Sequence, residues 1–157
     1  TPPDSLEKIA STFKESPIIA VHMGGGGAGY LEAEHQYKIS RELGLKYPNI
    51  KYILSAKRDT HIESDLISYQ LAGAPFSENL YCASDAPYGN VSWNFGGFRA
   101  LFASLMNYRD HPDERLRKNP GLFQECDVQR YLGGNFARFM AGRYEHLLNC
   151  LTQSIEV

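Results

Sequence analysis

Three short apolar segments, each followed by polar residues, organise the first half of the chain. A continuous apolar run at residues 18–21 ends at His22, and similar segments occupy residues 50–54 and 80–83. Such runs are too short for helices and are typical of strands that are buried on both faces in a parallel sheet. The pattern therefore predicts three parallel strands that begin near residues 17, 50 and 80.

The segments between and after these strands have apolar residues at helical spacing. Gly44 and Gly73 are placed to end the second and third helices, and Gly133 and Gly134 to separate the last two. Each strand with its helix takes roughly 30 residues, the usual size of a right-handed parallel crossover unit. We expect an α/β fold with helices over residues 5–15, 30–43, 60–71, 95–108, 124–132 and from 135 onward, and a polar link over 110–120.

Composition narrows the class of protein. The 157 residues, 43% of them hydrophobic, predict one globular domain over residues 1–157, and a net charge of −2 argues against nucleic acid as a partner. The chain has neither an apolar run of roughly 18 residues nor a signal-peptide pattern, so we expect a cytoplasmic protein without a membrane partner. Cys82, Cys126 and Cys150 include no Cys-x-x-Cys pair, which favours reduced thiols.

Polar side chains follow all three predicted strands, at the edge where α/β barrels and open α/β sheets place their active sites. His22 follows the first strand and precedes Met23 and four glycines. Its imidazole is a candidate acid, base or ligand, and the glycines, with Gly24 and Gly25 first, leave room for a substrate. A hydrogen-bonded structural histidine is the alternative interpretation.

Charged residues follow the other two strands. Asp85 is a carboxylate that needs a partner or a metal if it is buried, although a helix cap or a loop salt bridge explains it equally well. Lys57 and Arg58 are candidates for binding a substrate carboxylate. The alternative is a solvated loop in which they pair with Asp59.

The glycine-rich segment supports a different hypothesis. Residues 24–29 satisfy G-x-G-x-x-G between a strand and a helix, a setting in which backbone N–H groups bind phosphate. Four consecutive glycines fit many spacings, and neither Glu42 nor Asp59 lies at the distance expected for a ribose-binding acid. A small domain that binds a nucleotide or another phosphate through Gly24, Gly25 and the following residues remains the alternative function.

Three motifs resemble the C-terminal part of the amidohydrolase-related metal-dependent hydrolases. They are AVHMGGGG at residues 20–27, YCASDAPYG at 81–89 and DVQRYLGGNFARFM at 127–140. This family includes aminocarboxymuconate-semialdehyde decarboxylase, resorcylate decarboxylase and oxalomesaconate hydratase. The resemblance covers residues 17–140 and implies strands six to eight of a TIM-type (β/α)8 barrel.

The resemblance also implies roles for the strand-end residues. Asp85 matches the family's metal ligand and proton-transfer carboxylate, and His22 matches the histidine that polarises substrate or water. The expected cofactor is a divalent metal, zinc first, and the expected chemistry is hydrolysis, decarboxylation or hydration of a small carboxylated substrate.

The family's first-strand His-x-His pair and fifth-strand histidine have no counterpart here, and a complete barrel takes roughly 250 residues. We therefore expect the N-terminal half of a barrel, or another chain, to complete the site, with the isolated fragment inactive. A non-catalytic module that forms a homo-oligomer through its apolar face is a third hypothesis.

Overall fold

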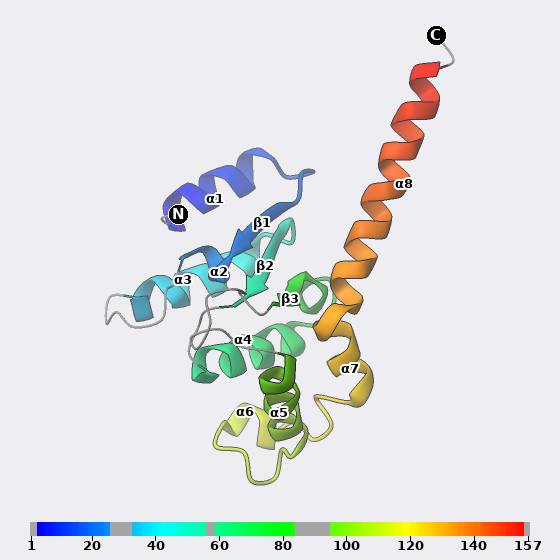
Figure 1. Cartoon of the computed structure of the whole chain (residues 1–157). Helices are drawn as coiled ribbons and strands as arrows, with labels where there is room; N and C mark the ends of the chain where they lie inside the picture. Colours follow the sequence, from blue (N-terminus) through cyan, green and yellow to red (C-terminus); the bar gives the residue numbers. More distant parts are fainter. Residues whose placement is uncertain (1–2, 26–32, 56–58, 84–94, 156–157) are drawn as a thin grey trace.

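The computed structural model describes residues 3–25, 33–55, 59–83 and 95–155. Strands β1 (Ile18–Val21), β2 (Ile50–Leu54) and β3 (Leu80–Cys82) form one sheet in the order β1-β2-β3. Both pairs of neighbouring strands are parallel. The predicted strands, their direction and the α/β class are therefore confirmed (Figure 1).

Helices connect the strands and form most of the C-terminal half. Figure 1 shows α4 and α5 together beside the sheet, while α8 runs away from the body of the molecule. The helical elements are α1 (Pro3–Thr12), α2 (His22–Gly25), α3 (Ala33–Lys46), α4 (Asp59–Ala72), the 3-10 helix η1 (Phe76–Asn79), α5 (Phe95–Met106), α6 (Glu114–Arg117), α7 (Glu125–Gln129), the π-helical turn η3 (Arg130–Gly134) and α8 (Asn135–Ile155).

Gly44 and Gly73 were both expected to end helices, but only Gly73 does so. Gly73 follows α4 with a φ of 71°, the left-handed conformation expected after a helix, so that prediction is confirmed. Gly44 lies inside α3, which continues to Lys46, so the predicted end at Gly44 is wrong. A Cβ atom at Gly44 would lie 1.9 Å from Oη of Tyr69 and 2.3 Å from Cε2 of Tyr52. Gly44 therefore serves the close packing of α3 on its neighbours.

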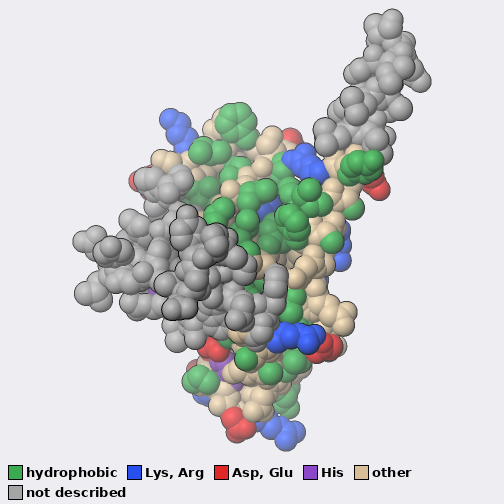
Figure 2. All heavy atoms as spheres, in the orientation of Figure 1, with side chains coloured by type: hydrophobic (Ala, Val, Ile, Leu, Met, Phe, Trp, Pro, Cys, Tyr) green, Lys and Arg blue, Asp and Glu red, His purple; other side chains and the backbone are tan. Residues whose placement is uncertain are grey.

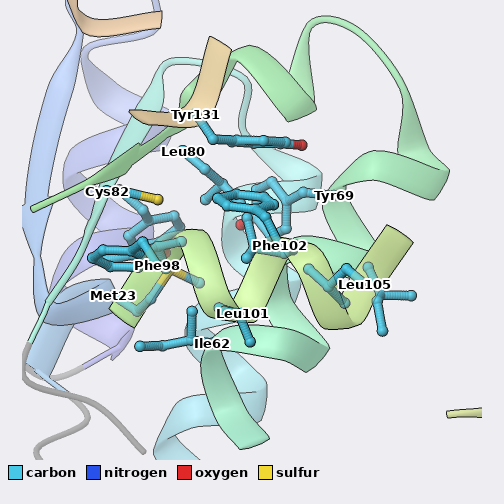
Figure 3. Packing of buried hydrophobic residues seen from close by; sticks show 14 of the residues in the cluster. Met23, Ile62, Tyr69, Leu80, Cys82, Phe98, Leu101, Phe102, Leu105 and Tyr131 are labelled. Atoms are coloured by element: carbon cyan, nitrogen blue, oxygen red, sulfur yellow. The ribbon is translucent and has the colours of Figure 1, made fainter. Parts of the chain in front are cut away.

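The main core lies between one face of the sheet and the helices. On β2 the alternate residues Ile50, Tyr52 and Leu54 are fully buried, as expected for side chains that point to one face. Figure 3 shows Leu80 and Cys82 of β3 close to Phe98 and Phe102 of α5. The core also includes Ile62, Leu66, Ile67 and Tyr69 of α4 and Phe123 and Tyr131 from the C-terminal half.

The opposite face of the sheet is largely open. Ile19 and Val21 of β1 are 48% and 47% exposed, so the expectation that this strand is buried on both faces is wrong. The reason is that no described element covers these two side chains, whereas Phe136 and Phe139 of α8 pack on Tyr81 at the other end of the sheet. Figure 2 shows hydrophobic side chains gathered on the face over the sheet and the start of α8.

The C-terminal half contains one departure from the predicted pattern and one confirmed break. The polar link at residues 110–120 contains the short helix α6, whose first turn is capped by the Asp113 side chain. Gly133, within η3, has non-helical dihedral angles (φ 172°, ψ −28°), so the chain kinks between α7 and α8 and the predicted separation of these helices at the glycines is confirmed. Across the described ranges, no helix combines the length and the apolar content needed to cross a membrane.

Candidate functional site

The candidate site is built on His22, the first residue after β1. His22 and Met23 have φ angles of 55° and 53°, in the left-handed region that residues other than glycine rarely adopt. Such conformations cost about 1–3 kcal/mol each and persist where the surrounding structure holds them. Met23 is fully buried in the core, and this anchors the turn that carries the imidazole.

Ser55, the first residue after β2, holds the His22 ring. Nδ1 of His22 lies 2.9 Å from Oγ of Ser55 and 3.2 Å from the Ser55 carbonyl oxygen. A carbonyl oxygen can only accept, so a proton on Nδ1 that is shared between the two oxygens satisfies both contacts. With the proton on Nδ1, the lone pair of a neutral imidazole is on Nε2, whereas with the proton on Nε2 the Ser55 hydroxyl donates to Nδ1.

The geometry brings the ends of β1 and β2 together, as sequence reasoning predicted. β1 and β2 are parallel neighbours, and α2, which begins at His22, contacts β2. Ser55 is 1% exposed, so the partner of His22 belongs to the rigid core. The sequence placed Ser55 in the polar group after β2 but gave no signal that it would bind His22, because that contact joins residues 33 positions apart.

The third strand ends at the same edge. The backbone N–H of Ala83 donates to the carbonyl of Leu54 at 3.0 Å, which continues the pairing of β3 with β2 past Cys82. Cys82 itself is not a candidate nucleophile, because burial raises the pKa of its thiol and its side chain faces the core.

Several predicted site residues lie outside the described residues. These are Asp85, Lys57 and Arg58, together with the second half of the glycine segment. Gly24 and Gly25 are described and belong to the helical turn α2, directly beyond His22. In the part of the chain that the structure describes, no three His, Cys, Asp or Glu side chains gather as a metal-binding group.

Comparisons with known proteins leave the resemblance untested. No family model matches the chain, and no match was found among curated proteins or among solved structures. The amidohydrolase resemblance therefore remains a prediction that rests on the three sequence motifs.

Proposed function

We propose that this chain supplies the C-terminal strands of a metal-dependent (β/α)8-barrel enzyme of the amidohydrolase kind. The observation that supports the proposal most is the His22–Ser55 pair at the shared carboxyl edge of two parallel strands. A histidine whose ring is held through Nδ1 at this edge is suited to polarise a substrate or move a proton.

The position of Asp85 in the sequence agrees with this role. Asp85 follows Ala83, the last described residue after β3, by two positions in the sequence. We propose Asp85 as a metal ligand and proton-transfer carboxylate, and Lys57 and Arg58, which follow Ser55 closely, as the groups that bind a substrate carboxylate.

A divalent metal such as zinc would supply a polarised oxygen at this edge, with its remaining ligands contributed from outside these residues. His22 fits such a site through the chemistry of its Nε2 nitrogen. The reaction class that we propose is hydrolysis, or a related decarboxylation or hydration, of a small carboxylated compound.

The open face of the sheet also agrees with a barrel segment. In a barrel, side chains on one face of the strands point to the interior and helices cover the other face. Here α4 and α5 pack on the face that carries Tyr52 and Leu80. The apolar Ile19 and Val21 of β1 lie on the opposite face, whose β3 end is occupied by α8. We propose that further strands of the barrel cover Ile19 and Val21.

One contact limits where such strands can pair. The side-chain amide of Asn135 donates to the carbonyl of Leu80 at 3.1 Å, so this part of the β3 edge already has a partner. A further strand next to β3 would therefore pair with residues of β3 that follow Leu80. The other edge of the sheet, where a strand could also pair, is β1.

Metal analysis of the natural gene product tests this function. We expect about one equivalent of zinc or manganese, and an Asp85→Asn variant that loses most of it, because an amide is a much weaker ligand than a carboxylate. Asp110→Asn is the matched control, since Asp110 is an exposed aspartate in the loop after α5. Equal metal content in the wild type and in Asp85→Asn would refute the assignment. Tight nucleotide binding without metal would favour the alternative function of the glycine segment.

A further inference from the structure

A cavity of about 140 Å³ lies at the opposite end of the sheet from His22. Lys51, the second residue of β2, and Glu78, which precedes β3, place it near the amino ends of the strands. Ser55 lies four positions after Lys51, and four residues of strand span about 13 Å. The cavity is therefore separate from the candidate catalytic edge.

Asn135 gives this cavity a buried acceptor without a partner. Its side-chain nitrogen donates to the carbonyls of Ser77 and Leu80, at 3.0 and 3.1 Å, which uses both of its hydrogens and fixes the orientation of the amide. Asn135 is only 3% exposed, and its Oδ1 atom makes no hydrogen bond. A buried polar atom of this kind costs about 1–3 kcal/mol unless water or a ligand satisfies it.

The charges around the cavity favour an anion. Lys51 and Arg138 are cations, while Glu78 is a single carboxylate, which leaves one formal positive charge in excess. Arg138 pairs with Glu78 at 2.9 Å and is largely exposed, so its remaining donors are accessible from solvent. Burial lowers the pKa of Lys51, and Glu78 only partly opposes this effect. An anion beside Lys51 would stabilise its charged form.

Aromatic rings form the apolar part of the wall. Tyr81 and Phe139 both line the cavity, and their ring centroids lie 6.0 Å apart. Burial and, to a lesser extent, the nearby Glu78 raise the pKa of Tyr81 to about 12, so its hydroxyl stays protonated and is available as a donor. The cavity volume of about 140 Å³ is sufficient for a small molecule.

We propose that this cavity binds a small carboxylate that also carries a hydroxyl or amino group. The carboxylate pairs with Lys51 and Arg138, and the second group donates to Oδ1 of Asn135. The carbon atoms of the ligand lie against Tyr81 and Phe139. No residue in this assignment belongs to the candidate catalytic edge, so the proposal survives if the metal site proves wrong.

Lys51 is visible in the sequence as an unusual residue, although the pattern of apolar residues does not assign it a role. Lys51 interrupts an otherwise apolar strand, and it points to the open face together with Ile53. A charged side chain in the middle of such a strand needs a partner, which here is provided in part by Asn79 and the carbonyl of Pro48.

Three small probes test the proposal without altering the fold. Glycolate carries both required groups, acetate lacks only the hydroxyl, and glycolamide lacks only the charge. In NMR titrations that follow the side-chain amide of Asn135, we expect glycolate to bind at millimolar concentration. We expect acetate and glycolamide to bind at least about tenfold more weakly, because each leaves one buried group unpaired. Equal binding of glycolate and acetate, or no shift of the Asn135 amide with any probe, would overturn the proposal.

Substitutions of exposed arginines provide the second arm of the test. Arg138→Gln removes a cation from the cavity, and we expect the glycolate Kd to rise about fivefold or more. Arg99→Gln is the matched control, because Arg99 is an exposed arginine of α5 outside the cavity lining and its substitution should leave the Kd unchanged. Asn135 is not substituted, because its contacts to Ser77 and Leu80 support the fold. Equal Kd values for the two arginine variants would contradict the proposed site.

Discussion

At the scale of single residues, the packing around Gly44 leaves no room for a side chain. A methyl group there would overlap the Tyr69 hydroxyl and the Tyr52 ring, both of which are fully buried. The Tyr52 hydroxyl also donates to the carbonyl of Ser40 on α3 at 2.6 Å, so the ring cannot move away without losing a buried hydrogen bond. The absence of a side chain at Gly44 therefore sets how closely α3 approaches β2 and α4.

We predict that Gly44→Ala lowers the free energy of unfolding by about 1–3 kcal/mol, because overpacking outweighs the roughly 1 kcal/mol that alanine gains over glycine in a helix. Gly142→Ala is the control. Gly142 lies in α8 with no atom within 4 Å of the added Cβ, so this variant should be equally stable or more stable. Urea denaturation measures both, and a stabilising Gly44→Ala would contradict the packing.

Residue patterns predicted His22 as a candidate, but they did not predict its geometry. Its place after an apolar run was visible in the sequence, and the structure confirms that it follows β1. The positive φ angle and the bond to Ser55 depend on the neighbouring strand and on the burial of Met23. Contacts between residues distant in the sequence carry no periodic signal, which is why the roles of Ser55 and Asn135 escaped prediction.

At the scale of elements, helix α6 depends on its first turn. Asp113 accepts from the backbone N–H of Arg115 at 2.8 Å and pairs with the Arg115 guanidinium at 2.6 Å. Arg115 also donates to the hydroxyls of Ser64 and Ser68 on α4. The cap therefore connects α6 to the body of the molecule, although the helix has only four residues.

The pH dependence of this cap has a defined sign. Hydrogen bonding to the Arg115 side chain lowers the pKa of Asp113 below its usual value, so the ionised form is favoured in the folded protein. The stabilisation is therefore present above the unfolded pKa of about 3.9 and is lost as the pH falls through the lower folded value.

We predict that Asp113→Ala costs about 0.5–2 kcal/mol at pH 7, as for other N-cap substitutions, and that Asp113→Asn costs less because asparagine still caps. Both variants should lose less stability than the wild type between pH 5 and the acid limit. Unfolding curves at several pH values measure this. An unchanged acid slope in both variants would show that the Asp113 carboxylate does not contribute.

The sequence predicted the presence of strands and helices better than it predicted the residues at which they end. Strands β1 and β2 agree with their apolar runs, and α4 ends at Gly73 as expected. Helix α3 passes through Gly44 because its packing, not its backbone conformation, requires glycine. Helix α6 was missed because its four residues are too few to show a helical period.

At the scale of the whole molecule, the open face of the sheet distinguishes two interpretations of the chain. A barrel segment would have this face covered by other strands, whereas a self-contained domain would leave it exposed. Ile19 and Val21 are about half exposed, and the exposed Phe136 and Met140 of α8 add to the apolar surface on this side. Large exposed apolar patches are typical of surfaces that contact a protein, a membrane or a ligand. The apolar run of β1 predicted burial on both faces, and the sequence could not show how α8 borders the open one.

We predict that Val21→Lys disrupts the natural gene product, because further strands would bury the ammonium group without a partner at a cost of several kcal/mol. Leu71→Lys is the control. Leu71 is also a partly exposed apolar residue, but it lies near the end of α4, away from β1. Metal content and size-exclusion chromatography report the outcome, and identical behaviour of the two variants would argue against a covered face.

The most direct test of the central claim is an anomalous difference map, measured at the absorption edge of the bound metal, from crystals of the natural gene product. We predict a single strong peak at the carboxyl edge of the sheet, within coordination distance of the Asp85 carboxylate and next to the His22 imidazole. A peak elsewhere in the molecule, or a metal-free protein that retains full activity, would contradict the account.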